Sequence, residues 1–430
     1  MVGKVFLFAF LAALPLFAAG EQAVKAVKAE GEYKNMVKGG MHYYAFTQGF
    51  PKAHSIWSAM GITSDDMIYV GVSDHTVNSG LFKYDSKKDV MIYLGDVLGN
   101  GKLWLHEWQG KIHTPIIQNP KDGLVYFGTD AGNGIWECAG IPGSEYVGGH
   151  WFVIDPKTDK ISDLGLGTRY MGLKSIAVDP IHNRLFATTD PSSHFIIYNI
   201  DKGKSPKYEE EKDACKDLGC INGAHEPRMV WTDKWGNCYT VNEIGQLVEY
   251  VAATGELRRL NSVLIPMAPG TPTWQPAQGA SAVLPVNDKE FYYGITYYGR
   301  LFKHVPEEKG EGKVIDLGNG WGNDNYNDQL KIGCLALGQN NKLYYVIGGH
   351  GRFVTADSSA ILVEFDPETK KKTLIYKFDQ IVTECTGGAT DTKGNIYFAA
   401  HGQSVPEPGK EAIRKPYLIK FHPSTIERAK

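Results

Sequence analysis

The sequence lacks the motifs by which several large enzyme classes hold their reactive groups. It contains no Walker-type glycine loop, no G-x-S-x-G run and no C-x-x-C-H, so phosphate-loop hydrolysis, α/β-hydrolase chemistry and covalent haem are not indicated. It has no block of Lys or Arg, and its formal net charge is only −3 over 430 residues. This balance argues against nucleic acid as a partner.

Long apolar runs are also scarce, and the one that is present lies at the N-terminus. Lys4 precedes an apolar run that extends to Phe17, and the small residues 18–20 precede Glu21. This is the pattern of a signal peptide over residues 1–20, cut before Glu21, and no later run is long enough to span a membrane. We therefore expect residues 21–430 to form a single domain that is secreted or periplasmic, and monomeric.

Cysteine is sparse, with six in the whole chain. In an oxidising compartment the C-x4-C pair Cys215 and Cys220 is close enough in sequence to form a disulfide, which we predict within a charged loop. The other four cysteines show no metal-type spacing and are interpreted as buried thiols.

Glycine and aromatic residues, in contrast, are abundant, and the aromatics repeat. The chain has 49 glycines and 12% aromatic residues, and segments such as "MIYVGVSD", "LVYFGTDA" and "IYFAAHGQ" are versions of one unit. Seven of these units occur at steps of about 52 to 60 residues. Their aligned aromatics are Tyr69, Tyr126, Phe186, Tyr239, Tyr292, Tyr344 and Tyr397.

Each repeat contains the same order of short β-rich runs, separated by Gly, Asp, Asn and Pro. Four strands in each of seven units predict an all-β fold, a seven-bladed β-propeller. The last unit ends after "YLIKFHPST" without a fourth strand. Residues 42–49 have strand character, so we predict that this N-terminal strand completes blade seven and closes the ring.

This topology predicts that most histidines gather on one face of the disc. The loop from the second to the third strand and the connection into the next blade emerge on the same face. The first kind of loop holds His75, His150, His194, His350 and His401, and the second holds His54, His106, His113 and His225. Arg228, Arg169, Tyr170, Trp274, Tyr297 and Tyr298 lie in the same loops. We expect His225, His350, Arg169, Tyr170, Trp274 and Tyr298 to bind substrate.

These side-chain types are suited to proton abstraction beside a carboxylate. A neutral imidazole can accept a proton, a second imidazole or a phenol can donate one, and a guanidinium can hold a carboxylate in a bidentate pair. A fixed cation stabilises the charge that develops when a proton is removed next to a uronic carboxylate. These are the groups that β-elimination from a uronate sugar requires.

The motifs "KIHTPI", "LVYFGT", "GGHWFVIDPKT", "SSHFIIYNI" and "HEPRMV" resemble the secreted β-propeller polysaccharide lyases, most closely the short ulvan lyases. The resemblance implies catalytic roles for His113 and His150, and it implies that Arg228 neutralises the uronate carboxylate. His194 stands where that family has a tyrosine in blade three, Tyr297 stands where blade five has a histidine, and Trp274 or Gln275 replaces a tyrosine. We accordingly take His194 and Tyr297 as further catalytic candidates.

The resemblance implies an acidic, ulvan-like polysaccharide as the partner, no nucleic acid, and a mechanism that requires no cofactor. Two alternatives stay open. A non-catalytic propeller that binds a glycan or a protein would also place aromatics and histidines on one face. A calcium or zinc site, structural or catalytic, could draw on Asp74, His75, His350 and His401, although their spacing is not typical of a metal motif.

Overall fold

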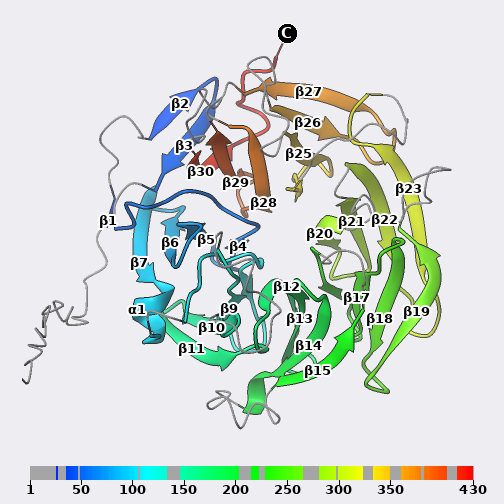
Figure 1. Ribbon diagram of the computed structural model, residues 1–430. Coiled ribbons are helices and arrows are strands. Elements are labelled where there is room, and N and C mark those ends of the chain that lie inside the picture. The colour runs from blue at the N-terminus through cyan, green and yellow to red at the C-terminus, as the bar shows by residue number, and fades with distance from the viewer. Residues whose placement is uncertain are drawn as a thin grey trace, which may run out of the picture.

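The protein is described by a computed structural model in which seven antiparallel sheets are arranged in a ring (Figure 1). The structure describes residues 26–27, 35–46, 49–104, 107–132, 146–202, 215–221, 228–264, 280–296, 299–322, 333–348, 360–378, 382–403 and 414–429. The predicted signal peptide lies outside this range. The predicted fold, a seven-bladed β-propeller with four-stranded blades, is confirmed.

The first four blades follow the chain, each from its innermost to its outermost strand. Blade 1 contains β4 (Met60–Ile62), β5 (Met67–Ser73), β6 (Ser79–Asp85) and β7 (Val90–Asp96), with β1 (Ala26–Val27) added outside. Blade 2 contains β8 (Ile117–Gln118), β9 (Val125–Gly128), β10 (His150–Asp155) and β11 (Lys160–Leu166). Blade 3 contains β12 (Gly172–Asp179), β13 (Arg184–Asp190), β14 (His194–Asn199) and β15 (Cys215–Cys220). Blade 4 contains β16 (Trp231–Thr232), β17 (Cys238–Val241), β18 (Gln246–Val251) and β19 (Glu256–Val263).

The remaining three blades complete the circle. Blade 5 contains β20 (Ala280–Val286), β21 (Phe291–Thr296), β22 (Arg300–Val305) and β23 (Lys313–Asn319). Blade 6 contains β24 (Ala336–Leu337), β25 (Leu343–Ile347), β26 (Ile361–Phe365) and β27 (Lys372–Lys377). Blade 7 contains β28 (Glu384–Thr390), β29 (Ile396–Gln403), β30 (Arg414–Phe421) and β3 (Met41–Ala45), with β2 (Met36–Lys38) added outside.

Helix is minor in the described part of the chain, where it comprises α1 (Val97–Gly101) and a 3-10 turn at Ile200–Lys202. Within those same residues, no helix combines the length and the apolar character that crossing a membrane requires.

The repeated aromatics are the core of the fold. All seven lie on the second strand of their blade, and each is at most 2% exposed. Between blades the backbones approach closely. A Cβ atom on Gly61 of β4 would lie 1.6 Å from the carbonyl oxygen of Ile116 in blade 2. A glycine at this position therefore allows the two inner strands to pack side by side.

The ring is closed by the N-terminal strand, as predicted. Within the predicted span of residues 42–49, the pairing strand is β3, and Tyr43 lies opposite Ile419 of β30. The pairing gives β30 a neighbour on its outer edge and joins the two ends of the chain in one sheet. Closure of this kind leaves fewer unpaired backbone groups at sheet edges.

The predicted disulfide between Cys215 and Cys220 is wrong. Both residues are thiols, and they are the two ends of one extended strand, β15, rather than parts of a loop. A strand rises about 3.3 Å per residue, so residues five apart are separated by roughly 16 Å, far beyond the reach of a disulfide.

The closure can be tested by removing one side chain of β3. Tyr43 is 2% exposed and packs edge-on against Tyr417 of β30, with ring centroids 6.0 Å apart. Loss of this buried ring in Tyr43→Ala should lower the free energy of unfolding by about 3–5 kcal/mol, measured by urea denaturation. His42→Ala, on the same strand but only half-buried, is the control and should change it by less than about 1 kcal/mol. A loss no larger in Tyr43→Ala than in His42→Ala would contradict closure by β3.

Candidate functional site at the ring centre

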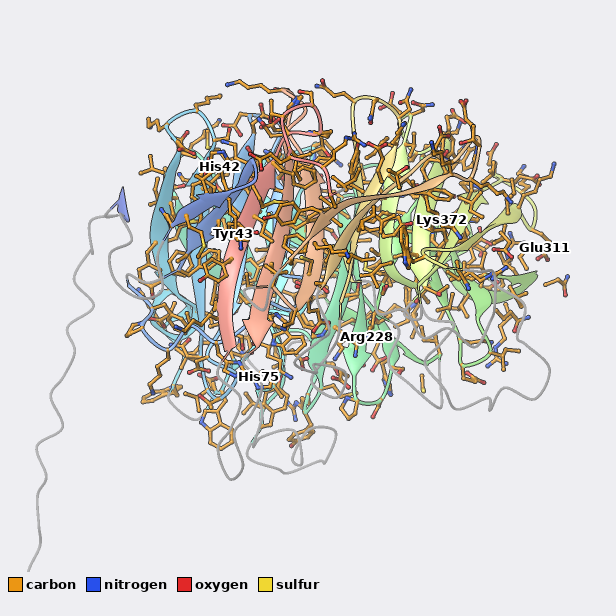
Figure 2. The ribbon with its side chains drawn as sticks, turned by 90° about the horizontal axis from the view of Figure 1, so that it is seen from above. His42, Tyr43, His75, Arg228, Glu311 and Lys372 are labelled. Carbon is orange, nitrogen blue, oxygen red and sulfur yellow. The ribbon has the colours of Figure 1, made fainter. Side chains whose placement is uncertain are left out.

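Several histidines from neighbouring blades lie around one tryptophan. Trp57, in the segment that leads into β4, is 7% exposed. Its ring centroid lies 5.4 Å from that of His75, 5.4 Å from that of His401 and 6.3 Å from that of His113. These three residues belong to blades 1, 7 and 2. Figure 2 shows His75 and Arg228 at one side of the disc and His42 toward the other.

The imidazole of His113 is oriented by the backbone of the next blade. Its Nδ1 lies 3.2 Å from the carbonyl oxygen of Lys174 at the start of β12. Because a carbonyl oxygen only accepts a hydrogen bond, Nδ1 must carry the proton, and in the neutral ring Nε2 then carries the lone pair. His113, 3% exposed, is therefore held in the tautomer that a general base requires.

Four buried charged side chains lie beside His113. Lys111 and Asp130 face each other across an antiparallel bridge and exchange both backbone hydrogen bonds, so their side chains leave the same face of blade 2. Lys174 comes from blade 3, where its Nζ lies 2.9 Å from Asp190 and 3.9 Å from Asp130. None of the four is more than 6% exposed. Buried charges of both signs in this number are unusual for a structural core.

Their titration is shifted by burial. Burial lowers the pKa of Lys111 to about 8, although the charge of Asp130 opposes this and that of Lys174 adds to it. Burial likewise raises the pKa of Asp130 to about 7, against the effect of Lys174. Strong shifts caused by burial together with a specific charged neighbour are typical of functional sites.

Arg228, immediately before β16, adds a third positive charge to this group. Its charge contributes to lowering the pKa of Lys111, which places the guanidinium within electrostatic reach of the lysine. The cluster then holds three cations (Lys111, Lys174 and Arg228) against two carboxylates (Asp130 and Asp190). With all five groups ionised, one positive charge is in excess, and this excess favours an anionic ligand.

Among the buried polar atoms without a hydrogen-bond partner in the described part of the chain, three belong to this cluster or influence it. Oδ2 of Asp130, Oδ1 of Asp190 and the hydroxyl of Tyr146 are buried there without a hydrogen-bond partner. Burial, with the charges of Asp130 and Asp190, raises the pKa of Tyr146 well above its usual value, so this phenol keeps its proton. A Cβ atom on Gly172 would lie 1.8 Å from Oδ1 of Asp130, so a glycine is needed beside that carboxylate.

His150 lies on the same blade as His113 but faces the other way. Its Nδ1 is 2.9 Å from Oδ1 of Asp163 on β11. The side chain of His150 points to the same side of β10 as that of Phe152, because side chains two residues apart on a strand share a face. Phe152 packs in the blade 1 core. The structure therefore does not bring His150 to the face of blade 2 that holds His113 and the buried charges.

The other predicted residues in the described range lie farther out in their blades. His194, at the start of β14, is hydrogen-bonded to Asp217 on β15, with 2.7 Å between Nδ1 and Oδ2. Arg169 is exposed and Tyr170 half-buried in the connection that leads into β12. His225, Trp274, Tyr297, Tyr298 and His350 lie outside the described residues.

Of the residues offered as metal ligands, Asp74, His75 and His401 lie in the described part of the chain. Among the described residues, no group of three or more His, Cys, Asp or Glu side chains could hold an ion. His401 instead places Nε2 3.3 Å from Oε2 of Glu384 on the neighbouring strand β28. His350 lies outside the described residues.

Sequence reasoning missed Trp57, Lys111, Asp130, Lys174 and Asp190. One signal was available for Lys111, which stands two residues before His113 on an extended segment and so shares its face. Asp130 and Asp190 end aromatic strands on the predicted functional face. Lys174 carries no such signal, because a lysine within an apolar run reads as an exposed residue.

No family model matches this chain, and no curated protein matches its sequence. Two crystal structures of proteins provisionally named 6-phosphogluconolactonases are similar in fold. The one from Bacteroides uniformis ATCC 8492 is 12% identical with a TM-score of 0.47, and the match covers 75% of this chain and 85% of that one. The one from Bacteroides fragilis NCTC 9343 is 15% identical with a TM-score of 0.45, and the match covers 75% and 84%.

Lys174 should be essential for the stability of the cluster. Lys174→Met leaves two buried carboxylates without their ammonium partner, and we expect the free energy of unfolding to fall by about 3–5 kcal/mol in urea denaturation at neutral pH. Lys234→Met is the matched control, because Lys234 pairs with Glu290 where both side chains are solvent-accessible. That variant should stay within about 1 kcal/mol of the wild type. Equal stability of the two variants would show that the buried ion pairs are not essential.

Proposed function

We propose that this protein is a polysaccharide lyase that cleaves a uronate-containing polymer by β-elimination at the ring centre. The observation that carries the proposal is the placement of His113. Its imidazole is held with Nε2 as the proton acceptor, beside a buried cluster in which cations outnumber carboxylates. A base next to an anion-binding group is the arrangement that proton removal beside a carboxylate requires.

In this proposal the positive charges hold the carboxylate of the sugar. Arg228 is the group best suited to this, because a planar guanidinium can bind a carboxylate through two parallel hydrogen bonds. When the proton on the neighbouring carbon is removed, negative charge develops on that carboxylate. A cation already fixed there stabilises the transition state more than the ground state.

His113 then accepts the proton from C5 of the uronate at Nε2. The electron pair of the broken C–H bond forms the C4–C5 double bond, and the bond from C4 to the glycosidic oxygen breaks. Trp57, whose ring lies close to both His113 and Lys111, offers an apolar surface beside these groups. The resemblance to the ulvan lyases supports a sulfated algal polymer as one substrate class to test.

The test is a panel of uronate polysaccharides, ulvan included, incubated with the purified protein. A lyase generates an unsaturated uronyl product that absorbs in the ultraviolet. On a polymer that is cleaved, His113→Ala should lower turnover by about 10²- to 10⁴-fold, because a general base is lost. Arg228→Lys should also lose most activity, because an ammonium does not reproduce the bidentate fork.

His42→Ala is the matched control, since this histidine lies on the outer strand β3 of blade 7. It should keep wild-type turnover. Binding of a polymer without any ultraviolet product would instead identify a non-catalytic glycan-binding propeller. Wild-type turnover in His113→Ala would contradict the role given to this histidine.

A further inference from the structure

Lys111 is placed on the same side of the chain as His113. The segment before β8 is bridged to the end of β9 through Lys111. Ile112, between the two residues, packs into blade 1: a Cβ atom on Gly71 would lie 2.8 Å from its Cδ1. Side chains alternate along an extended segment, so Lys111 and His113 both face away from blade 1. Each also lies near the Trp57 ring, with the Lys111 Nζ 5.6 Å from the ring centroid.

The groups that face Lys111 come from every neighbouring element. Asp130 lies just after the second strand of its own blade, Lys174 and Asp190 come from blade 3, and Arg228 precedes blade 4. The Trp57 ring, from the segment that leads into β4, lies 5.6 Å from Nζ. Asp190 is the closer of the two carboxylates to Lys174, at 2.9 Å against 3.9 Å for Asp130. The ammonium of Lys111 is therefore held among two other cations, in a site that water reaches poorly.

We propose that Lys111 is the proton donor of this site, which delivers a proton from Nζ to the glycosidic oxygen that leaves C4. The assignment rests on the proposed lyase function and completes its proton balance. His113 takes the C5 proton, the electron pair of that bond forms the C4–C5 double bond, and the C4–O bond breaks with its electrons on oxygen. The oxygen takes the Lys111 proton and departs as a hydroxyl, and solvent later returns the protons to their starting groups.

The electrostatic setting is suited to this role. An ordinary lysine holds its proton too tightly to donate it readily, whereas burial lowers the pKa of Lys111 to about 8. At pH 7 the side chain is still mainly protonated, yet it is a much stronger acid than a lysine in water. General acids are most effective when their pKa lies near the working pH. The donor form is lost as the pH rises through about 8, so turnover should decline there.

Proton titration tests the ionisation without any substrate. The difference between the titration curves of the wild type and Lys111→Met should show one proton released with a midpoint near pH 8. A midpoint near 10.4, the value of a lysine in water, would overturn the proposal.

Turnover tests the donation itself. Lys111→Arg keeps a positive charge in the cluster, but a guanidinium does not release its proton in this pH range. It should lower turnover on the cleaved polymer by about 10²- to 10⁴-fold. Lys289→Met is the matched control: Lys289 is half-buried and burial lowers its pKa too, but it lies in the turn between β20 and β21, bonded to Thr232. That variant should keep wild-type turnover.

A substrate with a better leaving group separates a proton donor from a structural residue. A uronide that carries a nitrophenoxy group at C4 expels a phenolate, which needs no proton. Lys111→Arg should cleave it at close to the wild-type rate, whereas His113→Ala should not. Equal losses of Lys111→Arg on this uronide and on the polymer would overturn the donor assignment.

The two proposals can fail separately. If the wild type cleaves no uronate substrate, the proposed function is wrong and the donor assignment is overturned with it. If the wild type cleaves a polymer and Lys111→Arg does so equally fast, only the donor assignment is overturned.

Discussion

The pairing of β3 with β30 is the constraint on which the rest of the molecule depends. It joins the two ends of the chain in one sheet, so that the seven blades surround a common axis (Figure 1). Once the ring is closed, the blades converge, and residues on one face of neighbouring blades come together although they are far apart in sequence. Trp57, His113 and His401 meet in this way.

The convergence of the blades also explains how charged side chains can be buried at the ring centre. Each ionised group there is taken out of water at a large cost, which only a close opposite charge offsets. The ammonium of Lys174 offsets this cost for Asp190 at 2.9 Å and, more weakly, for Asp130 at 3.9 Å. Such a cluster is a weak source of stability, because apolar residues of the same size could fill the space. The proposed role in binding and proton transfer accounts for its shifted pKa values and for the buried carboxylate oxygens without a partner.

The architecture could be predicted from the sequence, because each repeat carries a buried aromatic such as Tyr126 at nearly the same position, and the missing outer strand of the last repeat pointed to the N-terminus. The candidate site was harder to predict. The face on which His113 lies follows from the topology. The opposite orientation of His150 depends on which of the two alternating sides of β10 its side chain occupies. The separation of Cys215 from Cys220 depends on their lying in one strand. The Lys174 contacts join blades 2 and 3, a relation that one sequence does not reveal.

The central claim is that the buried cluster beside His113 receives the carboxylate of an acidic sugar. A crystal structure of the inactive His113→Ala variant with a uronate oligosaccharide tests it most directly. The account predicts a uronate carboxylate in a bidentate contact with Arg228, with the glycosidic oxygen within hydrogen-bonding distance of Lys111 Nζ. A sugar bound on the opposite face, or a carboxylate that contacts neither Arg228 nor the lysines of the cluster, would contradict it.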